Sequence, residues 1–105
     1  MNTTTIAGCE VSVDDEGFMT NYDEWTDELC CELAANIGIT ELTDSHWEAI
    51  RFLRSDYVEK GETATLRRVT KVGGIPTKTL FVLFPKKPAK KMAYVSGLPK
   101  PHGCV

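Results

Sequence analysis

The chain has 105 residues, 42% of them hydrophobic, which is enough for one domain with a single core but not for two. It has no run of about 18 or more apolar residues, and its N-terminus, MNTTTIAGCE, has neither the basic flank nor the apolar stretch of a signal peptide. We therefore expect a cytoplasmic protein without a membrane partner, in which the four cysteines are reduced.

Charge is distributed unevenly, although the formal net charge is only −3. All 15 acidic side chains and 3 of the 12 basic ones lie in residues 1–62, which gives that part a net charge of −12. Residues 63–105 carry the other nine basic side chains and no carboxylate, a net charge of +9. The cationic part would attract anionic groups of a partner, although a merely solvated basic surface is the simpler interpretation.

The N-terminal part is predicted to form a β-hairpin and then a helix. In residues 9–19, apolar and polar side chains alternate up to an acidic turn in which Gly17 suits a positive φ, and this predicts a short hairpin within that segment. An apolar residue at every fourth position, from Trp25 to Ile37, then predicts a helix over residues 23–36, ended by Gly38.

The next predicted helix is the best marked. Thr43 suits its N-cap, Asp44 suits the positive end of its dipole, and Gly61 ends it. His46 falls on its apolar face, where we expect a hydrogen-bonded packing residue and not a catalytic one.

Three shorter helices are predicted in the C-terminal half, over residues 63–72, over residues 77–84 after a proline, and from Pro88 to about Ser96. In the first of them Leu66, Val69 and Val72 are expected to point inward and Arg67, Arg68 and Lys71 outward. The whole is predicted to be a mainly α domain: a small irregular, roughly orthogonal bundle of about five helices with an N-terminal hairpin and a flexible C-terminal arm.

The last nine residues, GLPKPHGCV, suit neither helix nor strand. Pro99 and Pro101 fix φ and donate no backbone hydrogen bond, while Gly97 and Gly103 allow hinges. We therefore divide the single domain, residues 1–105, into a body, 1–96, and a mobile arm, 97–105. A frayed tail is the plainer alternative, because chain ends are often disordered.

Cys104 is the candidate reactive residue, because it lies on this arm, one residue from the C-terminus. Cysteine attacks as the thiolate, which nearby cations favour and the terminal carboxylate opposes. The candidate supporting residues on the arm and before it are Gly97, Pro99, Lys100, Pro101, His102, Gly103, Lys90 and Lys91. His102 is a conceivable base, but a mobile segment positions it poorly.

The remaining cysteines suggest no site. They lack CxxC spacing and a matching histidine pair, so neither a metal nor a cofactor is predicted. Cys30 falls near an apolar stripe and is expected to be a small buried hydrophobe, whereas Cys31 and Cys9 have no evident role.

Several segments together resemble the DsrC/TusE family of sulfur-relay proteins. FPKKPAKK followed by GLPKPHGCV resembles the family's C-terminus, and DDEGFM, Trp25, ELTDSHWEAIRFLR and TLFVLFP resemble family segments in the family order. The resemblance covers nearly the whole chain and implies a helical fold with an N-terminal hairpin. It also implies a mobile arm whose penultimate cysteine, here Cys104, carries sulfur as a persulfide or mixed sulfide.

The resemblance also separates two kinds of member. Those that act with dissimilatory sulfite reductase have a second arm cysteine eleven residues earlier, where this chain has Ala93. TusE-type members, which relay sulfur toward tRNA thiolation, use the last cysteine alone, and this chain is more similar to them.

The leading hypothesis is therefore a sulfurtransferase-type carrier, not a stand-alone enzyme, whose partners are the protein donor and acceptor of a relay. The alternative is a gamma subunit or regulatory partner of a sulfite reductase that does not carry sulfur. A helix-turn-helix around residues 43–72 that binds nucleic acid is a third, disfavoured by the overall acidity.

Overall fold

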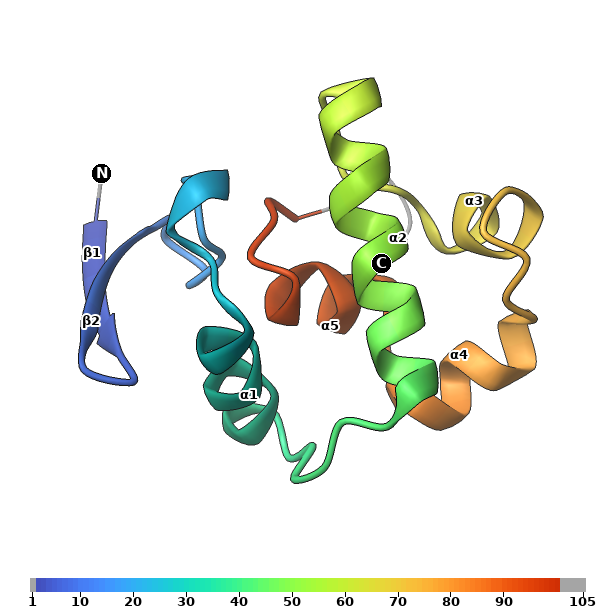
Figure 1. The fold of residues 1–105 in the computed structure, drawn as a ribbon, viewed down its shortest axis with the longest axis horizontal. Coiled ribbons are helices and arrows are strands. Elements are labelled where there is room, and N and C mark those ends of the chain that lie inside the picture. The colour runs from blue at the N-terminus through green and yellow to red at the C-terminus, as the bar shows by residue number, and fades with distance from the viewer. Residues whose placement is uncertain (1, 101–105) are drawn as a thin grey trace.

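A computed structural model, which describes residues 2–100, has five α-helices beside a two-stranded antiparallel sheet (Figure 1). This confirms the predicted mainly α bundle with an N-terminal hairpin. In chain order the elements are β1 (Asn2–Ile6), β2 (Cys9–Val13), the 3-10 turn η1 (Tyr22–Glu24), α1 (Asp27–Asn36), α2 (Asp44–Lys60), α3 (Leu66–Lys71), α4 (Thr77–Leu83) and α5 (Pro88–Val95).

The hairpin lies earlier in the chain than predicted. Residues 9–13 form its second strand, which pairs with β1 through a two-residue turn at Ala7 and Gly8, with φ of 52° and 79°. Positive φ at both central residues suits the twist of a hairpin, but alanine rarely adopts it, so Ala7 and Gly8 are not a clear turn signal. Met19 makes only a single bridge, to Val13, although Gly17 has the positive φ expected of it.

Helix α1 starts four residues later than predicted. The Thr26 side chain accepts a hydrogen bond from the backbone N–H of Leu29 and so caps a helix that begins at Asp27. Trp25 consequently lies outside the helix whose apolar stripe it was expected to share. Gly38, at φ 87°, follows the end of α1 as predicted.

Helix α2 has the predicted bounds, with Thr43 as N-cap and Gly61 after its last residue. His46 is 7% exposed and closes the capping box, because its Nδ1 accepts from the backbone N–H of Thr43 at 3.1 Å. Its Nε2 donates to the carbonyl of Leu83 at 2.9 Å. The predicted packing role of His46 is confirmed.

Helix α3 differs from the prediction in length and in its faces. It begins only after Thr65, whose side chain caps the backbone N–H of Arg68, and Val72 follows it 58% exposed instead of buried. Arg68 was expected to point into solvent. It is instead half-buried, because its side chain contacts Asp56 of α2. The other two helices follow the prediction, with Pro88 the first residue of α5.

Helix α5 is the most buried element and contacts α1, α2 and α4 (Figure 1). Five of its eight residues are buried, and the chain that leaves it continues into the core with Leu98 fully buried. The core side chains around it include Leu29, Leu33, Ile50, Leu53, Leu80, Phe84, Met92 and Val95. The C-terminal segment therefore starts from the centre of the molecule.

Candidate functional site

The structure describes only part of the predicted site. Gly97, Pro99, Lys100, Lys90 and Lys91 are described, whereas Cys104 and its neighbours Pro101, His102 and Gly103 lie outside the described residues. The geometry of the site is therefore that of the segment from which Cys104 extends.

A C-terminal cap of α5 fixes the start of this segment. Gly97 has a φ of 68°, its N–H donates to the carbonyl of Tyr94, and the N–H of Leu98 donates to that of Ala93. This is the Schellman pattern, in which the residue after the left-handed glycine packs against the last helical turn. This pattern explains why Leu98 is buried, although it was predicted to belong to the mobile arm.

Trp25 packs directly against this cap. Its indole Nε1 donates to the carbonyl of Val95 at 2.8 Å, and a Cβ added at Gly97 would lie 2.8 Å from the indole Cγ. Only a glycine leaves room for the ring at that place. The indole thus holds the last carbonyls of α5 and the first residue of the C-terminal segment together.

Arg54 of α2 also contacts this region. Its guanidinium donates to the carbonyls of Ser96 at 2.8 Å and of Tyr22 at 2.9 Å. Its Cζ lies 3.8 Å from the centre of the Tyr22 ring and 4.1 Å from that of Trp25, within the range of cation–π attraction. Burial lowers the pKa of Arg54 from its ordinary value, and Tyr22 and Asp23 oppose that shift.

Two further contacts carry the segment to Lys100. The hydroxyl of Thr63 donates to the carbonyl of Pro99 at 2.7 Å, and Lys100 Nζ lies 3.3 Å from the carboxylate of Glu16. Residues 97–100 thus lie against the body, and the predicted start of a mobile arm at residue 97 stays a prediction. Sequence reasoning missed this role of Trp25 and Arg54. Trp25 was assigned only to an apolar stripe and to a family segment, and Arg54 only to the end of a family segment.

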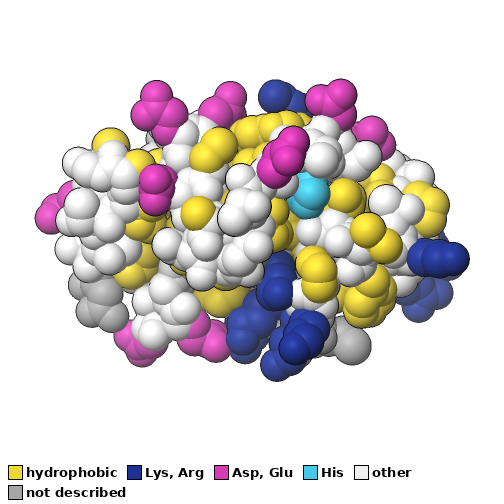
Figure 2. All heavy atoms as spheres, turned by 90° about the horizontal axis from the view of Figure 1, so that it is seen from below, with side chains coloured by type: hydrophobic (Ala, Val, Ile, Leu, Met, Phe, Trp, Pro, Cys, Tyr) yellow, Lys and Arg dark blue, Asp and Glu magenta, His cyan; other side chains and the backbone are white. Residues whose placement is uncertain are grey.

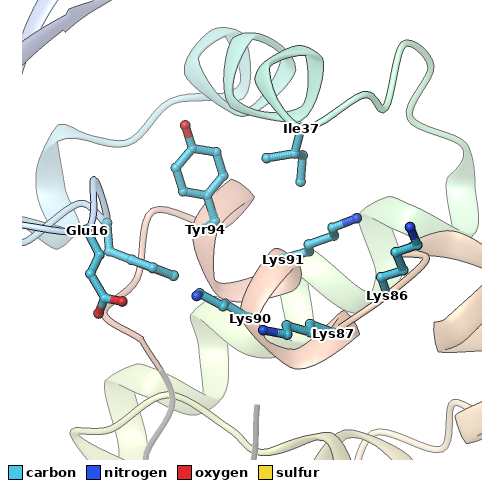
Figure 3. Close-up of a pocket in the computed structure, with 8 residues that line it drawn as sticks. Glu16, Ile37, Lys86, Lys87, Lys90, Lys91 and Tyr94 are labelled. Atoms are coloured by element: carbon cyan, nitrogen blue, oxygen red, sulfur yellow. The ribbon is translucent and has the colours of Figure 1, made fainter.

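A groove of about 430 Å³ lies beside this segment, and we call it the lysine groove. Figure 3 shows its lining side chains, which come from α5, the loop before α5, the end of α1 and the loop after β2. They are Glu16, Phe18, Ile37, Lys86, Lys87, Lys90, Lys91 and Tyr94. On the face drawn in Figure 2, several basic side chains lie together next to apolar atoms. Lys90 and Lys91 were predicted as site residues, and the structure places both in this groove.

The three cysteines within the described range differ in exposure. Cys30 is fully buried, and burial first, then the neighbouring Cys31 and Asp27, raises the pKa of its thiol to about 12. Cys9 and Cys31 are exposed. The prediction that Cys30 is a buried hydrophobe is confirmed. Among residues 2–100, no group of three His, Cys, Asp or Glu is placed to hold a metal ion.

Arg68 was predicted to belong to an outward basic face together with Arg67 and Lys71. It instead makes a bidentate pair with Asp56, at 2.7 and 2.8 Å, and Asp56 is only 5% exposed. The pairing occupies the guanidinium of Arg68, which leaves two of the three cations of that face to bind a nucleic-acid phosphate.

No helix in the described part of the chain is long and apolar enough to cross a bilayer.

Comparisons with known proteins cover almost the whole chain. The family model described as "DsrC like protein" matches residues 5–105. The chain is 37% identical to "Sulfurtransferase TusE" of Salmonella typhimurium, over 93% of this chain and 95% of that protein. The solved structure of Allochromatium vinosum DsrC is similar with a TM-score of 0.80 and 36% identity, over 99% of this chain and 98% of that one.

A crystal structure described as dissimilatory sulfite reductase I (DsrI) is also similar, with a TM-score of 0.84 and 32% identity over 99% of this chain and 100% of that one. At these identities and coverages the likeness concerns the complete described fold. It includes the hairpin, the five helices and the C-terminal segment.

Proposed function

The chain belongs to the DsrC-like protein family, and we propose that it is a sulfur carrier that holds sulfur as a persulfide on Cys104 and delivers it to a partner protein. The observation that carries the proposal is the extent of the match. The family model reaches residue 105 and so includes Cys104, and a TusE sulfurtransferase is similar along 93% of the chain.

The chemistry requires no cofactor, oxidant or reductant. The Cys104 thiolate attacks the outer sulfur of a donor persulfide, the donor's S–S bond breaks, and the donor cysteine leaves as a thiolate. A new S–S bond then joins that sulfur to Cys104, so the number of persulfides is unchanged. Delivery is the same exchange with a nucleophile of the acceptor.

The described residues suit this role. From Lys100, which is held by Glu16, Cys104 is four residue steps away, so its Cα can lie up to about 14 Å beyond a fixed point. Lys90, Lys91 and Lys100 provide positive charge near that point, which favours an anionic thiolate or persulfide. We assign Pro101 and Gly103 to the stiffness and freedom of the tip and leave His102 as a supporting charge or base.

We place this carrier in the cytoplasm, in a relay of the TusE kind that serves tRNA thiolation or related sulfur transfer. Ala93 supports this choice, because the resemblance assigns a second cysteine there to members that act with sulfite reductase. Its partners are the donor and acceptor proteins, and nucleic acid and membranes are not among them.

A gamma subunit or regulatory partner of a sulfite reductase is the second candidate. It is favoured by the likeness, reported above, to a crystal structure described as dissimilatory sulfite reductase I (DsrI). Such a subunit would bind its reductase even when Cys104 is replaced by serine. A carrier would lose its activity with that substitution.

The test is to incubate the reduced protein with a persulfide donor and measure its mass. The carrier should gain about 32 Da, the mass of one sulfur atom, on the peptide that contains Cys104. Cys104→Ser should abolish the gain, and the matched Cys31→Ser should not. Absence of the adduct, or its survival in Cys104→Ser, would contradict the proposal.

A further inference from the structure

The lysine groove combines an apolar floor with a cationic rim, and it lies beside the C-terminal segment. Resting on the carrier function proposed above, we propose that the groove docks an acidic segment of the relay partner, with at least one apolar side chain of that segment inserted between the lysines. The occupant is thus a protein segment that carries both carboxylates and a hydrophobic residue.

The floor of the groove is apolar and preformed. Phe18 and Tyr94 meet edge to face, with ring centres 5.8 Å apart and an interplanar angle of 85°, and Ile37 at the end of α1 completes the floor. A space of about 430 Å³ is large enough for one or two apolar side chains. A purely ionic site would not need such a floor.

The rim is strongly positive and largely unpaired. It has four lysines and one carboxylate, Glu16, which already pairs with Lys100. Lys91 donates to the carbonyl of Pro85. For the side-chain ammonium groups of Lys86, Lys87 and Lys90, no hydrogen bond or salt bridge to any other residue in the range 2–100 is found.

The surroundings make this charge selective. Residues 1–62, which form the hairpin, α1 and α2, carry a net charge of −12, so the groove borders a strongly acidic part of the body. An acidic partner would be repelled by the hairpin, α1 and α2 and attracted at the groove, which favours one docking orientation. A long phosphate backbone such as RNA would also meet the acidic areas, and this argues for a short segment of protein.

The loop that bears two of the lysines is held in an uncommon conformation. Lys86 and Lys87 both have left-handed backbones, with φ of 59° and 51°. A left-handed backbone at a residue other than glycine is unfavourable in free energy, and such conformations concentrate at binding sites. Here they place consecutive lysines on the rim of one groove (Figure 3).

The position of the groove connects docking with sulfur transfer. Glu16 lines the groove and also binds Lys100, the last described residue before Cys104. A partner segment in the groove would therefore lie next to the chain that presents the sulfur. Docking there would raise the local concentration of the partner's reactive group near Cys104.

The test uses the full-length, ¹⁵N-labelled protein and a synthetic helical peptide in which glutamates alternate with leucines at helical spacing. We expect saturable shifts of the amides of Phe18, Ile37 and Tyr94, and affinity that falls as salt is added. A peptide with every glutamate replaced by glutamine, and one with every leucine replaced by serine, should each bind at least about tenfold more weakly.

Variants identify the groove as the binding site. Lys86→Glu combined with Lys87→Glu should weaken peptide binding at least about tenfold, whereas Lys71→Glu with Lys78→Glu, the same charge change on α3 and α4, should have little effect. Equal losses in both double variants, shifts at another surface, or no saturable binding would overturn the proposal. Tighter binding of a short single-stranded RNA than of the peptide would also overturn it.

Two further measurements separate the possible failures. If removal of residues 101–105 alone reproduces the groove shifts, the chain's own end occupies the groove and the proposal is wrong. Sulfur uptake by Cys104 from inorganic polysulfide is measured on the same variants and should not change with Lys86→Glu and Lys87→Glu, because neither lysine is assigned to the support of Cys104. Loss of peptide binding in the groove variant, with sulfur uptake unchanged, supports the docking role of the groove. Absence of sulfur uptake in the unaltered protein refutes the carrier function.

Discussion

The indole Nε1 of Trp25 donates a hydrogen bond of 2.8 Å to the carbonyl of Val95, 70 residues further along the chain. This bond joins the segment before α1 to the last turn of α5. Because the C-terminal segment leaves α5 two residues later, Trp25 fixes the point from which Cys104 extends. Arg54 completes the arrangement by contacting the indole and donating to the carbonyl of Ser96.

Trp25→Phe should destabilise the fold by about 1–2 kcal/mol, because the carbonyl of the buried Val95 loses its donor while most of the aromatic volume remains. Chemical denaturation measures the change in the free energy of unfolding. Trp47→Phe is the matched control, since no hydrogen bond of its indole to another described residue is found. Equal losses in the two variants would show that the Nε1 bond contributes nothing.

Gly97→Ala should cost more than an ordinary glycine substitution. The new methyl group would clash with the Trp25 ring, and the alanine would have to adopt a left-handed backbone. Together these two effects predict a loss of about 2–4 kcal/mol in the free energy of unfolding. Gly61→Ala has a similar φ, 73°, with nothing within 4 Å of the added Cβ, so it should lose only about 1 kcal/mol. Thermal unfolding of both variants tests the difference, and similar shifts would contradict the steric argument.

Cys30 should resist alkylation in the folded protein. Its thiol is buried and has a pKa of about 12, so almost no thiolate forms at pH 8. Iodoacetamide followed by peptide mass spectrometry should modify the exposed neighbour Cys31 and leave Cys30 intact until urea is added. Modification of both at similar rates under native conditions would show that the α1 region opens readily.

Local chemistry predicted the helices well where a cap and a periodic apolar face agreed. Thr43 and Gly61 delimited α2, and Pro88 marked the first residue of α5. The start of α1 was misplaced because Trp25 continues the apolar spacing, whereas the hydrogen bond of Thr26 to the N–H of Leu29 decides where the helix begins. A side-chain cap can thus override an apolar period.

The site could be predicted only in part, because its supporting contacts join distant segments. The lysines were visible in the sequence, but their convergence with Ile37 and Phe18 depends on how α5 packs against α1. Arg68 was predicted to face solvent, since no pattern in α3 reveals a carboxylate buried on α2. Such pairs follow from helix packing and not from spacing.

The pair formed by Asp56 and Arg68 should make stability depend on pH in the acid range. The hydrogen bonds from Arg68, opposed by burial, lower the pKa of Asp56 from its ordinary value of 3.8. A carboxyl whose pKa is lower in the folded state binds fewer protons there than in the unfolded chain. Its stabilisation is thus complete above the unfolded pKa and is lost as pH falls through the folded one.

Asp56→Asn should therefore lose about 1–3 kcal/mol at pH 7, a modest figure because the Arg68 side chain is 33% exposed. Urea unfolding at pH 7 and at about pH 3 should show a smaller difference from the unaltered protein at the lower pH. Glu48→Gln, an exposed carboxylate on the same helix, is the matched control and should change little at either pH. A loss that is the same at both values would mean that the amide disturbs packing, and that the ion pair is not what stabilises this junction of α2 and α3.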